Sequence, residues 1–190
     1  KAVASNGTKK TQSIAELQDA LSILDKVLKT EVWDLHLELE QVPVATLFKR
    51  SLARMEAVIK TRQLWVQVHN LTTNVSLYTH SSSLELMLVE LLLAASYRTK
   101  VGDHIDIWCR ALQDNWVEIS ITDNGRLNPQ LVNAIQEQSD QPTLSDSILE
   151  TMPGLHFKVC KSLVEQLGGK LELANLEDGR SLSRLILPQV

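Results

Sequence analysis

The sequence predicts an α+β protein in which helices cover one face of a mixed β-sheet, a two-layer α/β sandwich. Segments with apolar residues three and four positions apart alternate along the chain with shorter segments in which every second residue is apolar. Each pattern leaves one apolar side to bury, and packing helices on a sheet buries both. With 190 residues, 44% of them hydrophobic, the chain is long enough for one domain with a substantial core.

The first 33 residues are predicted to precede this domain. Residues 1–13 are small, polar and glycine-containing, which is typical of a linker. Residues 14–33 are predicted to form a helix with one apolar seam. The seam consists of Ile14, Leu17, Leu21, Leu24 and Leu28. It predicts a homodimer formed through the Ile14–Leu28 helix, and an amphipathic helix lying on its own domain is the alternative. Because the chain begins with Lys1, we expect a fragment of a longer protein.

The remaining residues, 34–190, hold the predicted domain. It begins with a strand at 34–42, where leucines alternate with polar residues. Pro43 then starts a helix, because a missing backbone N–H costs nothing at the first helical position. Two short strands follow, at 64–70 and 75–80.

The second half of the domain continues this alternation. Its expected elements are a helix at 81–99, a strand pair at 104–112 and 116–123, a long polar loop at 128–153, a helix at 155–167, and strands at 170–175 and 181–188. The first of these helices opens with serines that can cap it, and it is apolar on almost every side, so we expect it to be central. The second ends at Gly168-Gly169, a left-handed stop.

Composition excludes some classes of function. A net charge of −4 and a pI near 5.7 argue against nonspecific electrostatic binding to nucleic acid. The most apolar segment is interrupted by Glu85 and Glu90 and is too short to span a bilayer, so no membrane is expected within this segment. Cys109 and Cys160 lie far apart in apolar surroundings, which predicts buried free thiols and a cytoplasmic location.

The stretch "ITDNGR" at 121–126 allows two interpretations. An alternating strand ends there in Asp-Asn-Gly. Taken alone, Asn124-Gly125 favours an ordinary tight turn, because both residues tolerate positive φ. The alternative is the floor of a nucleotide pocket.

The order of segments resembles the ATP-binding domain of sensor histidine kinases, the Bergerat fold shared with gyrase and heat-shock chaperone ATPases. The resemblance covers Leu35 to Pro188, and the 14–33 helix resembles the second helix of a kinase dimerisation bundle. "LMLVELLLAASYRT" lies where the family has its Asn box, "ITDNGR" at the first glycine box, and "PGLHFKVCKSLVEQLGG" at the second. Three motifs in the expected order favour the pocket over the turn.

The resemblance implies nucleotide-binding roles for Asp123, Gly125 and Gly154. Asp123 lies where the family's carboxylate accepts a hydrogen bond from the adenine amino group. Gly125 lies where the backbone approaches the base, and Gly154 where backbone N–H groups surround the phosphates. The sequence departs from the family pattern at Leu127 and His156, which replace glycines.

The Asn box departs further from the family pattern. The family's asparagine, whose side-chain oxygen holds magnesium, is replaced by Ala94, which offers no ligand. One turn earlier, Glu90 lies where gyrase-like members have a general base. Without a metal ligand at Ala94, we interpret Glu90 as a structural residue at the rim of a former pocket.

The predicted lid, 128–153, is also unsuited to a triphosphate. It contains four acidic residues and no Lys or Arg, an unfavourable charge distribution for an anionic ligand that the flanking Arg126 and Lys158 only partly offset. The acidic residues are Glu137, Asp140, Asp146 and Glu150. In addition, the dimerisation-type helix contains no histidine that could accept a phosphoryl group; the histidines are His36, His69, His80, His104 and His156.

These features together predict a degenerate histidine-kinase-like ATPase domain, a pseudo-histidine kinase acting as a regulatory module in two-component signalling. We expect weak or no ATP binding, no cofactor, and a protein partner that is a kinase or a response regulator. One alternative is a divergent active kinase or ATPase that binds ATP with Mg²⁺ and uses Glu90, Asp123 and Gly154. Another is a pocket that binds a different adenine-containing or small acidic ligand without turnover.

Overall fold

A computed structural model describes residues 38–69, 75–136 and 152–189. Its helices are α2 (Val44–Thr61), α3 (Ser81–Arg98), α4 (Pro129–Gln136) and α6 (Met152–Gln166). Its strands are β1 (Glu40–Pro43), β2 (Trp65–His69), β3 (Ser76–Thr79), β4 (His104–Ala111), β5 (Trp116–Asp123), β6 (Lys170–Asn175) and β7 (Ser181–Pro188). Five strands form one mixed sheet in the order β2-β4-β5-β7-β6, in which β2 and β4 are parallel and the other pairs antiparallel.

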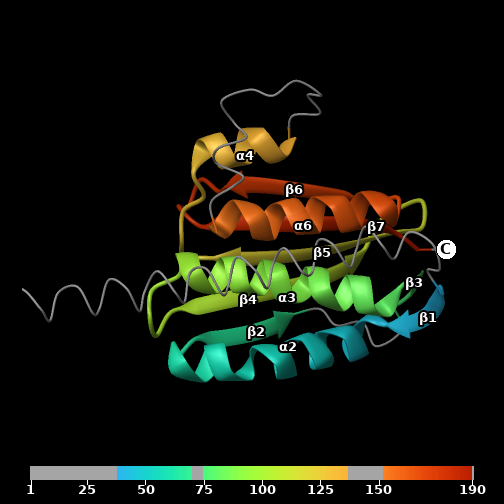
Figure 1. Ribbon diagram of the computed structural model, residues 1–190, viewed down its shortest axis with the longest axis horizontal. Helices are drawn as coiled ribbons and strands as arrows, with labels where there is room; N and C mark the ends of the chain where they lie inside the picture. The colour runs from blue at the N-terminus through green and yellow to red at the C-terminus, as the bar shows by residue number, and fades with distance from the viewer. Residues whose placement is uncertain (1–37, 70–74, 137–151, 190) are drawn as a thin grey trace, which may run out of the picture. The chain divides into compact units, whose positions relative to one another are not determined.

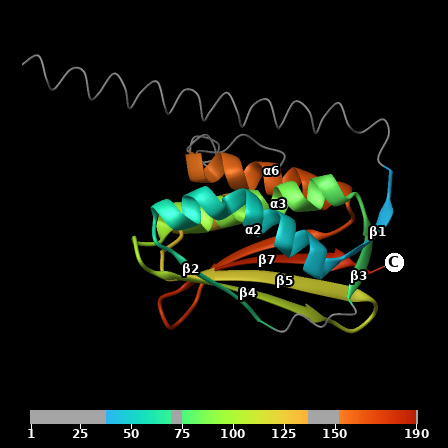
Figure 2. The same ribbon diagram turned by 90° about the horizontal axis from the view of Figure 1, so that it is seen from below.

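The described part of the chain has two layers. Helices α2, α3 and α6 lie side by side on one face of the five-stranded sheet, and no described helix covers the other face (Figure 1, Figure 2). The core lies between the layers, where alternate residues of β4 and β5, such as Ile107 and Ile119, are fully buried. This arrangement confirms the predicted α+β sandwich.

Helix α3 is central, as its sequence predicts, because it packs against both α2 and α6. Its N-cap corrects the prediction. The cap is His80, whose side chain accepts a hydrogen bond from the backbone N–H of Ser83, instead of a serine. At the other end Thr99 leaves the helical conformation, and its hydroxyl donates to the carbonyl of Ala95 at 2.7 Å.

Two further predictions need correction. Residues 38 and 39 of the predicted first strand are not in a strand, and residues 34–37 lie outside the described part of the chain. The strand that is described, β1, pairs with β3 in a separate two-stranded sheet, with Val42 opposite Leu77. Pro43 ends this strand and caps α2, which begins at Val44. The second correction concerns the expected loop at 128–153, because α4 lies within it and α6 begins at Met152. Leu131, Ala134 and Ile135 bury one face of α4 at helical spacing.

The turns agree with the sequence. The β4–β5 hairpin closes through Asp114 and Asn115, both with positive φ, and Gly168, just after the end of α6, has φ +68°. Cys109 and Cys160 are buried free thiols, as predicted. Among the described residues, no helix has the length and apolarity that crossing a bilayer requires.

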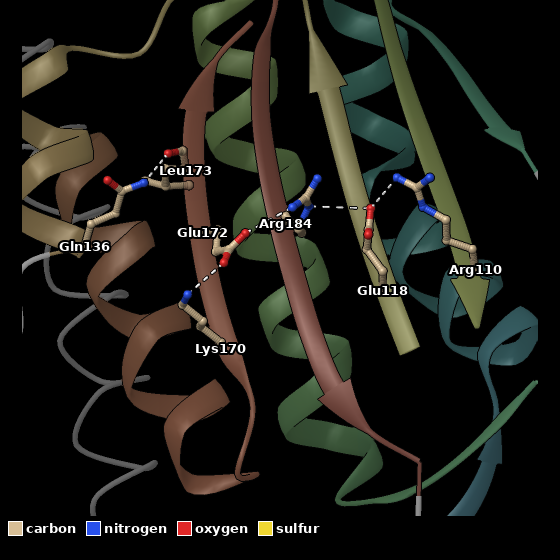
Figure 3. Close-up of polar contacts among 7 residues, drawn as sticks. All are labelled: Arg110, Glu118, Gln136, Lys170, Glu172, Leu173 and Arg184. Atoms are coloured by element: carbon tan, nitrogen blue, oxygen red, sulfur yellow. Dashed lines mark hydrogen bonds and ion pairs between the residues drawn. The ribbon is translucent and has the colours of Figure 1, made fainter. Parts of the chain in front are cut away.

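The uncovered face of the sheet carries alternating charges. Arg110 and Arg184 both approach Glu118, with nitrogen–oxygen distances of 2.8 and 3.5 Å, and Arg184 continues to Glu172 at 3.1 Å. Lys170 completes the row, 2.8 Å from Glu172 (Figure 3). The Lys170 ammonium, together with Arg184, holds the pKa of Glu172 below its usual value. Four strands are thereby linked by side chains as well as by their backbones.

Several sequence predictions lie outside the described residues. They are the linker at 1–13, the helix and dimer seam at 14–33, and the lid acids Glu137, Asp140, Asp146 and Glu150.

Candidate functional site

Three elements bring the predicted site residues together: the middle of α3, the end of β5 and the start of α6. Glu90 and Ala94 lie four residues apart on α3, Asp123 is the last residue of the central strand β5, and Gly154 lies in the first turn of α6. Asp123 faces Ile105 of β4 on one side and Ser181 of β7 on the other. All four predicted residues are buried.

The carboxylate of Asp123 is held by the chain itself. Its Oδ2 accepts a hydrogen bond from Nη2 of Arg98 at 2.6 Å, and its Oδ1 accepts from the backbone N–H of Gly125 at 2.9 Å. The side chains of Arg98 and Asp123 are 7% and 0% exposed. The Arg98 guanidinium also lies over the ring of Phe157 on α6, 5.4 Å from its centroid. Arg98 therefore joins all three elements of the site.

Sequence analysis did not identify Arg98. It lies four residues after Ala94 and eight after Glu90, so helical spacing brings it close to their side of α3. The helical spacing is the sequence signal that could have identified Arg98 as a site residue. Only the packing of the folded chain reveals Asp123 as the partner of Arg98.

Gly125 is required by a close contact with α3. A Cβ at this position would lie 2.4 Å from Cβ of Arg98 and 2.9 Å from its carbonyl carbon. No side chain fits at such distances without moving the helix end or the loop. The glycine of "ITDNGR" is thus explained by a contact within the protein.

A second buried pair links α3 to α6. Nδ1 of His156 hydrogen-bonds Oε2 of Glu90, and the two side chains are 4% and 0% exposed. The imidazole also stacks on Tyr97, with centroids 6.0 Å apart. His156 stands where the resemblance expects a glycine, and its ring fills space between the two helices.

The other replaced glycine is also part of the packed interior. Leu127 is 2% exposed. Its backbone N–H donates to Oδ1 of Asn175 at 2.9 Å, and its carbonyl accepts from Nδ2 of the same residue at 3.0 Å. The segment after Asp123 is therefore fixed to the end of β6.

One predicted ligand position at the site carries no side-chain group that could bind a metal ion. Ala94, which the resemblance places at the family's metal ligand, is fully buried and has no side-chain oxygen. The described residues contain no group of three His, Cys, Asp or Glu side chains placed to hold a metal ion. Asp123 and Glu90 both hydrogen-bond to side chains of the chain itself.

A sequence model of the histidine kinase-, DNA gyrase B- and HSP90-like ATPases matches residues 79–190, more than half of the chain. The chain belongs to this ATPase family. The expected resemblance is thus confirmed, and the two-layer sandwich is the fold of the family. No curated protein sequence matches the chain.

Solved structures of histidine kinases share this ATPase fold. The catalytic domain of histidine kinase ThkA superposes with a TM-score of 0.64 at 17% identity, over 80% of this chain and 97% of that one. The mycobacterial sensor histidine kinase MprB gives 0.60 at 22% identity, over 80% and 97%. Acinetobacter baumannii AdeS gives 0.64 at 16% identity, over 100% and 85%. At these identities the likeness shows the fold alone.

Proposed function

We propose that this ATPase-family domain is degenerate and acts as a regulatory, protein-binding module in two-component signalling, with weak or no ATP binding. The observation that carries the proposal is the buried ion pair between Arg98 and Asp123. In the family, the carboxylate at this position accepts a hydrogen bond from adenine. Here it already accepts from a guanidinium and a backbone N–H, so an incoming base must displace a charged partner.

The phosphate side supports the same proposal. Ala94 offers no metal ligand, and His156 occupies a place where a glycine would leave room for phosphate. Glu90 is engaged by His156 and is buried, which disfavours its use as a general base toward water. We assign Asp123, Gly125 and Gly154 to a former nucleotide site, and Glu90 to the packing of α3 against α6.

The proposed module acts in the cytoplasm through protein contacts. Its partner is a kinase or a response regulator, and the Ile14–Leu28 helix forms a homodimer. Such a module transmits a signal by packing and docking, without phosphoryl transfer.

One observation favours the alternative of an active, ATP-binding domain. The structure of full-length ShkA, which matches with a TM-score of 0.68 at 17% identity over 95% of this chain and 38% of that one, is a complex with AMPPNP. The same fold therefore holds an ATP analogue in that protein. In the alternative, Arg98 and His156 swing away when ATP and Mg²⁺ bind, and Glu90, Asp123 and Gly154 take up their family roles.

Calorimetric titration with ATP, with and without MgCl₂, distinguishes the two functions. We expect no magnesium-dependent binding at concentrations up to about 1 mM, where a native-state ligand of that affinity would also raise the melting temperature. Binding that is tighter than this and requires Mg²⁺ would establish the alternative.

Variants at Ala94 extend the test. Ala94→Asn restores the family's metal ligand, and Ala57→Asn, on the exposed face of α2, controls for the amide itself. We expect both variants to resemble the unaltered chain in the titration, because Asp123 and Glu90 remain engaged in either variant.

A further inference from the structure

Arg98 and an adenine base present the same chemistry to Asp123. The exocyclic amino group of adenine is an N–H donor on a planar ring, and a guanidinium is a planar group with N–H donors. Nη2 of Arg98 already donates to Oδ2 of Asp123, and the group lies over the Phe157 ring. An adenine base and Arg98 cannot both donate the same hydrogen bond to Oδ2 of Asp123.

The backbone on either side of the Arg98–Asp123 contact is held by other packing. Arg98 lies in the last turn of α3, and Gly125 packs directly on its Cβ and carbonyl carbon. The backbone positions of Arg98 and Asp123 are therefore fixed by packing that does not involve the guanidinium. Removing the guanidinium leaves those positions supported.

The guanidinium of Arg98 does not use all of its hydrogen-bond donors. Its Nε and Nη1 are buried, and neither has a hydrogen-bond partner among the described residues. Burying N–H donors without acceptors costs free energy, which opposes the ion pair that holds Arg98 in place. The closed arrangement is consequently weaker than a fully bonded arginine–carboxylate pair would be.

We propose that Arg98 is an intramolecular competitor for adenine, which occupies the base-recognition carboxylate Asp123 and keeps the site closed. The proposal rests on the proposed function, since it explains how the domain loses its nucleotide. Without the guanidinium, Asp123 regains a free acceptor and binds the amino group of adenine.

The experiment uses adenosine, because a nucleoside lacks the phosphates that Ala94 and His156 would affect. Calorimetry compares the unaltered chain with Arg98→Ala and Arg98→Met, the second of which keeps an apolar stem if truncation to alanine prevents folding. We expect the unaltered chain to show no saturable binding up to the highest adenosine concentration tested. A folded variant should bind adenosine with a dissociation constant at least about tenfold below that concentration. Arg180→Ala, which removes the exposed pair with Asp178, should behave like the unaltered chain.

Two comparisons identify Asp123 as the group that is released. Inosine carries a carbonyl where adenosine carries the amino group, so a folded Arg98 variant should bind inosine much more weakly. Adding Asp123→Asn to the Arg98 variant should abolish its preference for adenosine.

The proposal is overturned if a folded Arg98→Met chain does not bind adenosine, if it binds inosine equally well, or if the unaltered chain binds adenosine as tightly. The first two results leave the proposed function standing, whereas tight binding of adenosine by the unaltered chain also removes the observation that carries that function. That function fails separately, if the unaltered chain binds ATP in a magnesium-dependent way.

Discussion

The imidazole of His156 on α6 hydrogen-bonds the carboxylate of Glu90 on α3, and both side chains are buried. The ring also stacks on Tyr97, about two helical turns further along α3 than Glu90. The histidine at this position in α6 therefore bonds the two helices to each other. The pair is a structural bond between α3 and α6 at the proposed former nucleotide site.

Replacing His156 with alanine should destabilise the fold by about 3 kcal/mol, because a buried carboxylate loses its imidazole partner and a cavity is left between the helices. Urea unfolding followed by circular dichroism measures the change. His104→Ala, whose ring is mostly exposed, is the matched control and should change stability little. A double-mutant cycle with Glu90→Gln should give a coupling energy above about 1 kcal/mol. Simple additivity of the two changes would contradict the assigned bond.

Gly125→Ala should destabilise the fold by about 2–3 kcal/mol, because its Cβ would lie 2.4 Å from Cβ of Arg98. Gly102→Ala is a useful comparison, since a Cβ there meets nothing within 4 Å but the backbone has φ +82°. It should cost about 1 kcal/mol from strain alone. Thermal or urea unfolding of both variants shows which one loses more unfolding free energy. If Gly102→Ala is the more damaging change, the close approach of the loop to α3 is not a determinant of stability.

The layers and the order of most elements could be predicted because they follow from local patterns. The alternation of apolar residues predicts β4 and β5, and Gly168 adopts the expected positive φ just after the end of α6. Helix α4 was missed because its polar surroundings masked a short run with Leu131, Ala134 and Ile135 at helical spacing. The separate pairing of β1 with β3 depends on tertiary packing, which no local pattern encodes.

The candidate site shows a similar division. The convergence of Asp123 with α3 and α6 followed from motif order. Its contact with Arg98 joins residues 25 positions apart and depends on a side-chain conformation chosen by the surrounding packing. The sequence marks His156 only as a replaced glycine, because its partner Glu90 is 66 positions away. Sequence patterns located these residues but did not reveal their partners.

Glu118→Gln should destabilise the fold by about 2 kcal/mol, because this buried carboxylate accepts a hydrogen bond from Arg110 and pairs with Arg184 on the uncovered face of the sheet. The Glu118 side chain is 6% exposed, so added salt should screen its interactions little. Glu56→Gln removes an exposed pair with Lys60 and should produce no measurable change. Denaturant unfolding at low and high salt tests both variants. Equal effects of the two changes would show that the row of charges does not stabilise the sheet.

Alkaline pH should destabilise the fold through Cys109. Burial raises the pKa of its thiol from 9.0 to about 11. As the pH rises past 9, the thiol of the unfolded chain loses its proton while the folded chain retains it, so unfolding is favoured increasingly until the folded pKa is reached. This contribution is absent below pH 9 and amounts to about 2–3 kcal/mol near pH 11.

Cys109→Ala isolates that contribution from other groups that titrate in the same range. The variant should be less stable than the unaltered chain at pH 7, because a buried side chain is truncated. The difference should narrow between pH 9 and 11, since only the unaltered chain carries the thiol. Unfolding free energies measured at several pH values in this range give both curves. Parallel curves would mean that the thiol at position 109 ionises as easily in the folded chain as in the unfolded one.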